Sequence, residues 1–397
     1  MPKVWPSVPP KPLPPAPPVP AAELERRRAG VRAQMSKAGI DVIVLSDQKN
    51  VAYLTDYRSL SWSYHARPVF AAISADDMVV FGSLAEARTV EVRARSFSSR
   101  YYDGYLPEAV AAISAWISER VSGPRRTALD YGQDFYGRGS LELVEALSEL
   151  SHDGKPVSAS QILWSVRVIK SRFEAELKRI AFEIVNSAFD TALASARLGM
   201  PEYELCQMVQ AQIFLNGAET ADPIAMLFSK GDFSYGRPAS DRRLEAGHYI
   251  WTDFRATYGG YPADRNRIAR AGEPEAWEVD VYGRVRALTV DLAGAVRPGM
   301  SCADLYARFE RMWIDADLGP LYSRVSRIGH GGGLDVTEPP SISRVDATEI
   351  RPGMILHLEP KLEREGAVFQ FEEVILVTDT GCEFLSALSP ETIPTVC

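Results

Sequence analysis

Short apolar runs alternate with longer amphipathic stretches over residues 21–160. The apolar runs are rich in β-branched residues and lie at residues 41–45, 69–73 and 78–81. Runs of this length and composition are typical of buried strands. Amphipathic helical patterns lie at residues 22–38, 84–93, 107–121 and 140–150. Strands that alternate with helices predict a layered α/β domain, which we expect to end near residue 160.

The pattern changes beyond residue 160, where long helical stretches are segregated from groups of strands. Helical periodicity is found at residues 172–198, 202–216, 274–295 and 301–315, and strand-like runs at 249–254, 354–360 and 367–378. Gly199 and Gly217 stop the first two of these helices. Segregated helices and antiparallel strands are typical of an α+β fold. We therefore expect a second, larger domain over residues 161–397.

Ten of the first twenty residues are proline. Proline lacks a backbone N–H and has a fixed φ, so such a segment forms neither a helix nor an interior strand. We expect residues 1–20 to form an extended arm that lies on the surface or projects from it. A ligand for an SH3-type domain is the alternative interpretation.

The overall charge and the cysteine pattern exclude several classes of protein. The 397 residues carry a formal net charge of −8, which argues against a nucleic-acid-binding protein. No run approaches the ~18 apolar residues of a membrane helix, and the N-terminus lacks the apolar core of a signal peptide. The scattered cysteines predict neither a disulfide framework nor a cysteine metal site; they are Cys206, Cys302, Cys382 and Cys397. We expect a cytoplasmic protein with no nucleic-acid or membrane partner.

Four carboxylates and one imidazole of the second domain stand out, and most of them lie in or beside apolar runs. They are Asp253, Asp264, His330, Glu359 and Glu372. A carboxylate in a buried strand costs free energy unless it is paired or bound to a cation. Hard divalent cations prefer carboxylate oxygens, and imidazole suits Zn, Mn, Fe and Co. The set therefore predicts a metal site.

The order and spacing of these residues resemble the creatinase/prolidase/methionine-aminopeptidase superfamily, the pita-bread metallopeptidases. The matching pieces are Asp253 with Asp264 eleven residues on, Gly329-His330-Gly331 followed by Leu334-Asp335 and Glu338-Pro339-Pro340, Pro352-Gly353-Met354 leading to Glu359-Pro360, and Glu372 leading to Thr378. The resemblance covers residues 161–397, and residues 21–160 resemble the N-terminal domain of the creatinase and prolidase branch. It implies an α+β fold: a C-terminal pita-bread metallohydrolase domain preceded by an α/β creatinase-like N-terminal domain.

The resemblance also implies a dinuclear site and a reaction. Two divalent metal ions per subunit (Mn, Fe, Zn or Co) would be bridged by Asp264 and Glu372. Asp253 would chelate one ion and His330 the other, while Glu359 would also handle the proton of the attacking water. The implied reaction is hydrolysis of an amide-type C–N bond in a small molecule or short peptide. The implied assembly is a homodimer with a shared active site.

The chain departs from the proline-specific peptidases of this family at three histidine positions. The stretch that aligns with the first, residues 233–237, contains no histidine, and Ser326 and Thr337 occupy the other two positions. In the family these histidines stabilise the tetrahedral intermediate and protonate the leaving amine. Their replacement favours a small carboxylated substrate over an ordinary peptide, and we expect Thr337 to contact it.

Other residues occupy the space around the predicted ligands. Arg255 is two residues after Asp253, so on a strand it shares that face. His357 precedes Glu359 by two residues, and Gln370 stands where proline peptidases often have arginine. One interpretation is that Arg255 binds a substrate carboxylate and that His357 is an acid/base group or an extra ligand. The other is that Arg255 forms an ion pair with a ligand carboxylate and that His357 is a packed, hydrogen-bonded neighbour.

An aromatic and cationic stretch, residues 62–68, precedes a predicted strand of the first domain. It resembles the creatinase segment whose arginine contacts the substrate carboxylate near a partner subunit's site. Arg67, with Tyr64 or His65, would then complete the pocket in a homodimer. The alternative is a surface loop with a structural arginine.

Three functions from different classes are compatible with the resemblance. A metal-dependent C–N hydrolase is favoured because the whole ligand set is present. A lyase similar to family members that cleave dimethylsulfoniopropionate is disfavoured, since the extra aspartate of those enzymes is Trp251 here and the aspartate after the histidine ligand is displaced to Asp335. A non-catalytic binding module of the same fold would usually have lost metal ligands.

Overall fold

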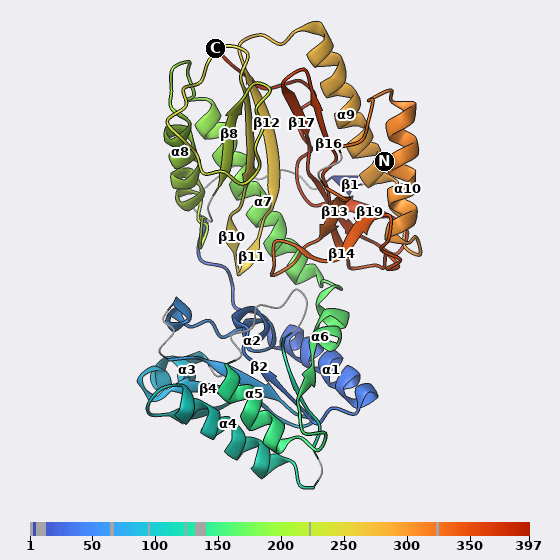
Figure 1. The fold of residues 1–397 in the computed structure, drawn as a ribbon. Helices are drawn as coiled ribbons and strands as arrows, with labels where there is room; N and C mark the ends of the chain where they lie inside the picture. Colours follow the sequence, from blue (N-terminus) through green and yellow to red (C-terminus); the bar gives the residue numbers. More distant parts are fainter. Residues whose placement is uncertain are drawn as a thin grey trace. The chain divides into compact units, whose positions relative to one another are not determined.

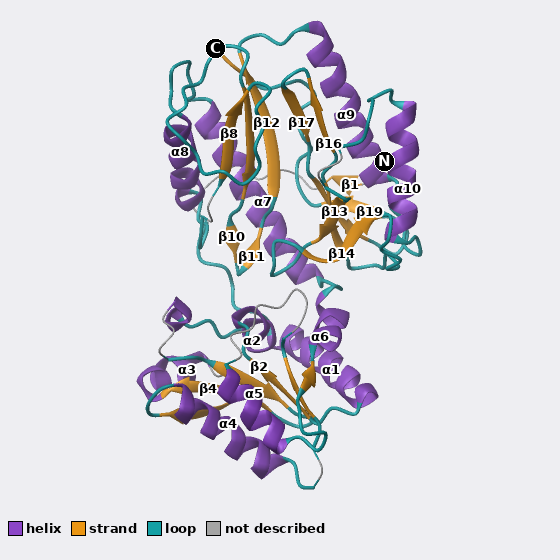
Figure 2. Ribbon diagram, viewed as in Figure 1, coloured by secondary structure: helices purple, strands orange, loops and turns teal. Residues whose placement is uncertain are grey.

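The computed structural model describes residues 3–4, 13–63, 67–93, 96–123, 125–131, 140–221, 224–322 and 325–397. They form two compact units, one of Pro18–Arg167 and one of Val168–Cys397 together with Met1–Pro17. Both units mix helices and strands (Figure 1, Figure 2). None of the described helices has the length and apolar character needed to cross a membrane.

The Pro18–Arg167 unit contains a six-stranded mixed sheet. In spatial order its strands are β5 (Ser98–Tyr102), β4 (Met78–Ser83), β3 (Phe70–Ile73), β2 (Val42–Leu45), β6 (Thr127–Leu129) and β7 (Val157–Ser158). β2 pairs antiparallel with β3 and parallel with β6. Every residue of β2, β3, β4 and β6 is buried, which explains their continuous apolar runs.

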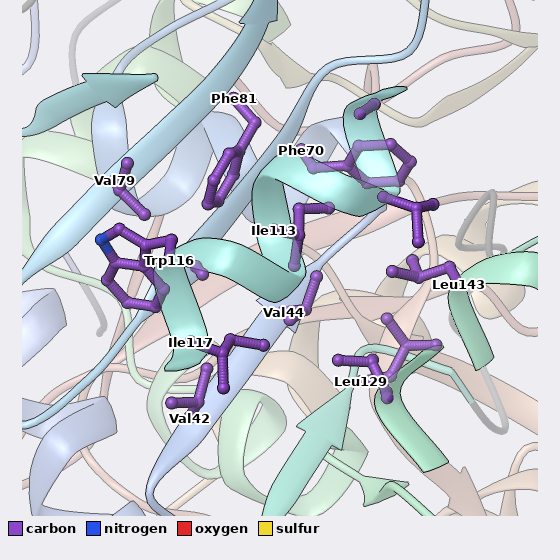
Figure 3. Close-up of a cluster of buried hydrophobic side chains, with 14 of the residues drawn as sticks. Val42, Val44, Phe70, Val79, Phe81, Ile113, Trp116, Ile117, Leu129 and Leu143 are labelled. Atoms are coloured by element: carbon purple, nitrogen blue, oxygen red, sulfur yellow. The ribbon is translucent and has the colours of Figure 1, made fainter. Parts of the chain in front are cut away.

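Helices pack on this sheet, and their apolar side chains complete the hydrophobic core. They are α1 (Ala21–Ala38), α2 (Gln48–Thr55), α3 (Ala87–Arg93), α4 (Leu106–Arg120), α5 (Leu141–Leu150) and α6 (Ser160–Arg167). Ile113, Trp116 and Ile117 of α4 are buried against the strands, as Figure 3 shows. The rings of Trp116 and Phe81 meet edge to face with centroids 6.1 Å apart, an arrangement that aromatic pairs prefer.

The larger unit contains two principal sheets. The six-stranded sheet has the order β1 (Lys3–Val4), β19 (Cys382–Phe384), β18 (Glu373–Val377), β15 (Ile355–Leu358), β13 (Arg327–Gly331) and β14 (Glu338–Ser343). The four-stranded sheet has the order β20 (Thr395–Val396), β12 (Arg265–Ala271), β9 (Tyr249–Phe254) and β8 (Ala225–Ser229). Two short pairs complete it: β10 (Thr257–Tyr258) with β11 (Tyr261–Pro262), and β16 (Lys361–Arg364) with β17 (Ala367–Gln370).

Four helices cover these sheets (Figure 1). α7 (Arg172–Leu193) and α8 (Glu202–Leu215) pack on each other and on the β8 to β11 region. α9 (Ala276–Gly294) and α10 (Cys302–Asp315) pack against β14, β17 and β18. A capping box between Ser171 and Glu174 starts α7, and a second between Ser301 and Asp304 starts α10.

The proline-rich segment contacts the larger unit where it is described. The Leu13 N–H donates to the Asn216 carbonyl over 3.3 Å, and the Tyr258 hydroxyl donates to the Pro14 carbonyl over 3.2 Å. Gly217 and Gly259 leave room for this approach, since a Cβ on Gly217 would lie 2.7 Å from the Leu13 nitrogen. These hydrogen bonds use acceptors and donors that a chain of prolines cannot satisfy within itself.

The expected α+β class is confirmed, but the prediction of individual elements is wrong or incomplete in several places. The run at residues 367–378 is not one strand, because β17 pairs with β16 whereas β18 pairs with β15 in another sheet. Its apolar residues are buried on both sides of the break, so hydrophobicity alone carries no signal of it. The short helices α2 and α6 were not predicted, and neither were the strands β5, β6, β8 and β12.

Candidate metal centre

A β-hairpin brings Asp253 and Asp264 together. Asp253 lies on β9, which pairs antiparallel with β12 so that Asp253 faces Asn266 across the ladder. Asp264 immediately precedes β12, and the small β10–β11 pair closes the connection. The eleven-residue spacing is therefore the number of residues that the chain needs to leave β9, turn, and come back beside Asp253 at the start of β12.

The neighbouring strands β13 and β15 position His330 and Glu359. β13 pairs antiparallel with β15, with His330 opposite His357 and the Glu359 N–H donating to the Ile328 carbonyl over 2.8 Å. The two imidazole rings stack with centroids 4.8 Å apart. Glu372 occupies the break between β17 and β18, and Asn266 N–H of the other sheet donates to its Oε2 over 2.8 Å.

The side chains of this cluster converge at distances suited to a cation. Ligand atoms of Asp264, His330, His357 and Glu372 all lie within 4.8 Å of one another, and these residues are buried. His330 Nε2 lies 3.5 Å from Asp264 Oδ2 and 3.5 Å from Glu359 Oε1. Both separations are too long for a good hydrogen bond and leave space between the atoms.

The hydrogen bond made by His330 supports the same interpretation. Its Nδ1 lies 2.8 Å from the Gly331 carbonyl, which can only accept, so Nδ1 carries the hydrogen. Nε2, the other ring nitrogen, faces the two carboxylates. A histidine whose Nδ1 is held by a backbone carbonyl in this way has Nε2 available as a metal ligand.

The carboxylates repel one another. Burial raises the pKa of Glu372 well above its usual value, and the nearby Asp264, Glu359 and Asp253 raise it further. Burial and the carboxylates of Asp264 and Glu359 likewise raise the pKa of Asp253 well above the ordinary value. Glu359 shows a raised pKa for the same first cause, burial. Because divalent cations would remove this repulsion, the donor set fits the metal ions that the sequence predicts.

His357 lies behind the cluster. It is fully buried, and its Nδ1 donates to Glu372 Oε1 over 2.6 Å. Burial, followed by the charge of Lys178, lowers the pKa of His357 well below the usual value, so the ring is neutral. Its Nε2 makes no hydrogen bond within the described part of the chain. This placement matches a residue that orients Glu372, although its other nitrogen is a potential ligand atom.

The cluster opens onto a cavity of about 460 Å³. Its wall includes Arg255 and Thr337 together with the carboxylates of Asp253, Asp264 and Glu359. The Arg255 Nε lies 3.4 Å from Asp264 Oδ1, so its guanidinium is engaged with a predicted ligand and still faces the cavity. Thr337 has no charge with which to replace the family's histidine.

The predicted substrate-binding residues Arg67, Tyr64 and His65 belong to the N-terminal part of the chain. Arg67 belongs to the Pro18–Arg167 unit, where it is exposed. Tyr64 and His65 lie outside the described residues. Their proposed role at a partner's pocket therefore stays a prediction.

Several residues in or behind the cavity wall were given no role from the sequence, although Gln370 and Trp251 were noted there as departures from family patterns. Lys361 and Arg327 line the wall, and Tyr235 places its hydroxyl 3.4 Å from Asp253 Oδ2. Gln370 donates from Nε2 to Glu359 Oε2 over 3.1 Å, while Trp251 donates to Gln370 Oε1 over 3.0 Å. Three of these stand two residues from a predicted ligand: Lys361 after Glu359, Trp251 before Asp253 and Gln370 before Glu372. On a strand that spacing puts two side chains on one face, which is the signal the sequence offers for them.

Asp253 provides a test of the charge repulsion. Replacing it with asparagine should raise the thermal midpoint of the chelator-treated protein at pH 7.5, by about 2–6 °C if the repulsion costs about 1–2 kcal/mol. A carboxylate whose pKa is raised in the folded state stabilises it fully below the unfolded pKa, ~3.9, and loses this contribution as the pH rises through the folded pKa. The gain from Asp253→Asn should therefore shrink as the pH is lowered toward about 4. Thermal unfolding at several pH values measures it, and an unchanged midpoint at pH 7.5 would contradict the repulsion.

Comparisons with known families agree with both units. The model of metallopeptidase family M24 matches residues 176–379, and the model of the creatinase/prolidase N-terminal domain matches residues 27–169. The expected fold, a pita-bread domain preceded by a creatinase-like domain, is thereby confirmed. The M24 match spans every predicted ligand, from Asp253 to Glu372.

The relatives are peptidases. An Xaa-Pro dipeptidase of Pyrococcus furiosus is 28% identical over 259 residues, covering 64% of this chain and 73% of the relative. One of Pyrococcus horikoshii is 24% identical over 90% of this chain and 96% of its own length. Among solved structures, the Xaa-Pro dipeptidase of Bacillus anthracis superposes with a TM-score of 0.81 at 20% identity, covering 94% of this chain and 100% of that one, which shows a shared fold.

Proposed function

The chain belongs to metallopeptidase family M24, and from that premise we propose that it hydrolyses an amide-type C–N bond in a small carboxylated substrate or short Xaa-Pro-like peptide. The observation that carries the proposal is the convergence of four carboxylates and His330, of which Asp253, Asp264, His330 and Glu359 line an open cavity. The ligand set is proposed as Asp253, Asp264, His330, Glu359 and Glu372. Neither the lyase nor the non-catalytic alternative finds support among the relatives.

Two divalent metal ions, when bound there, would lower the pKa of a water and polarise the substrate carbonyl. Asp264 and Glu372 would hold these ions together with Asp253, His330 and Glu359. Mn, Fe, Zn and Co all suit this mixture of carboxylate and imidazole.

Glu359 is the proposed proton carrier. Its carboxylate lines the cavity beside His330, where it would lie next to a water bound at the metal site. The Gln370 amide holds Oε2 in place, and Trp251 fixes the orientation of that amide. Glu359 would take a proton from the attacking water and deliver it to the leaving nitrogen.

Tyr235 is the proposed replacement for one missing histidine. It lines the cavity beside Asp253, and burial and the charge of Asp253 raise its pKa to about 12. The hydroxyl is therefore neutral at physiological pH and can donate a hydrogen bond to an oxygen that gains negative charge in the transition state. In a homodimer, Arg67 of the partner would add a second contact, as the resemblance implies.

Turnover of Xaa-Pro dipeptides and tripeptides by the Mn-loaded protein tests the proposal. We expect cleavage that a chelator stops and that added Mn restores, because the ligand set is complete. Small N-acyl amino acids serve as a second panel, since the histidines of ordinary proline peptidases are absent. A folded, metal-loaded protein that cleaves neither panel would contradict the proposed substrate class.

A further inference from the structure

Lys361 lies among four aromatic rings at the cavity wall. Its Nζ is 4.4 Å from the ring centroid of Phe233, 5.1 Å from that of Trp251, 5.2 Å from that of Tyr322 and 5.6 Å from that of Tyr235. All four separations are within the ~6 Å range of cation–π attraction. Lys361 begins β16 directly after Glu359-Pro360, so its ammonium group is tied to the strand end that carries the proposed base.

The aromatic surroundings hold this ammonium group in place. Phe233 and Trp251 are buried and meet edge to face with centroids 5.0 Å apart. Trp251 is fixed further by its hydrogen bond to Gln370. A lysine in water samples many rotamers, so an ammonium group preorganised at the cavity wall costs less entropy when it meets an anion.

A second cation, Arg327, faces the same cavity from the other strand pair. It begins β13, three residues before His330, and its side chain is half-buried. The guanidinium makes no hydrogen bond or ion pair with any residue that the structure describes. Arg255, the third cation of the cavity, is instead engaged by Asp264.

We propose that Lys361 and Arg327 form a subsite that binds the carboxylate group of the substrate. The inference rests on the proposed function and assigns the anion recognition that the sequence had suggested for Arg255 to a different pair of residues. A planar guanidinium matches a carboxylate, and the caged ammonium adds a fixed positive charge. The substrate carboxylate would then not compete for the five proposed metal ligands, and the metal site would remain available to the substrate carbonyl.

Matched ligands and variants separate this subsite from the metal centre. N-acetylproline carries the carboxylate, and N-acetylprolinamide has the same shape without the charge. Binding to the Mn-loaded protein is measured by calorimetry for the wild type, Lys361→Met, Arg327→Met and the double variant. Lys230→Met removes the same charge at an exposed position that does not line the cavity. Metal content and circular dichroism establish that each variant is loaded and folded.

We expect each cavity substitution to weaken N-acetylproline binding roughly tenfold and to leave N-acetylprolinamide binding within about twofold. Lys230→Met should change neither. If the double variant keeps the full preference for the carboxylate, the anion is bound elsewhere and the subsite is wrong. If the variants cannot be loaded with Mn, the same pair of ligands is compared in Lys361→Gln and Arg327→Lys, which keep polar atoms at both positions.

Kinetic measurements distinguish failure of the proposed subsite from failure of the proposed hydrolase reaction. Metal-dependent cleavage by the wild type with equal preference for acid and amide substrates would overturn the subsite while the hydrolase stands. A wild type that cleaves nothing but binds N-acetylproline through Lys361 and Arg327 would overturn the proposed reaction while the subsite stands. In an active enzyme, the substitutions should raise KM for carboxylated substrates and leave kcat within about threefold.

Discussion

Replacing Asp264 with alanine is expected to abolish metal retention and to lower hydrolytic activity by at least about 10³-fold, with the fold intact. Asp264 is buried at the junction of the two sheets, and its Oδ2 faces His330 Nε2 across 3.5 Å. It is one of the five proposed metal ligands, so its loss would remove a carboxylate from the binding site. Metal analysis of the purified variant and turnover of the dipeptide panel measure the two effects.

Removal of this carboxylate should not unfold the protein. Burial raises the pKa values of Asp253 and Glu372, and the charge of Asp264 raises them further. The variant therefore loses charge repulsion as well as a ligand. Asp291→Ala on the exposed face of α9 is the matched control and should retain both metal and activity. An Asp264→Ala protein that stays active and metal-loaded would contradict the proposed ligand set.

The spacing of ligands was readable from the sequence because it reflects backbone geometry. Asp253 and Asp264 are separated by a hairpin, and a hairpin fixes the number of residues between two facing positions. The match of Gly329-His330-Gly331 and Glu359-Pro360 to a family pattern has the same origin, since β13 and β15 are paired neighbours. Element existence and approximate extent followed from the apolar periodicities, as for α7 and β9.

The environment of the cavity was not readable in the same way. Lys361 is caged by rings from residues 233, 235, 251 and 322, and a contact between such distant positions has no periodic signature. Gln370 was noticed only as a departure from an expected arginine, whereas its hydrogen bonds to Glu359 and Trp251 depend on the break between β17 and β18. That break is invisible in a run whose residues are buried on both sides.

Replacing Gly329 with alanine is expected to destabilise the protein by about 3 kcal/mol or more, the upper part of the range for forced overpacking. A Cβ at this position would lie 2.0 Å from the His357 carbonyl oxygen and 3.1 Å from Ile342 Cδ1. The first of these is a backbone atom of the paired strand, so relief requires β13 and β15 to separate. Thermal unfolding of the metal-free protein measures the loss.

The same substitution should also weaken metal binding, because His330 is the next residue and its ring is placed by this strand pair. Gly283→Ala is the matched control: Gly283 is exposed on α9, nothing lies within 4 Å of its would-be Cβ, and alanine should stabilise the helix by about 0.5–1 kcal/mol. If Gly329→Ala unfolds at the wild-type temperature, β13 and β15 do not approach as closely as the structure has them. The glycine before the histidine would then have no role in close packing, and its presence in the ligand motif would need another cause.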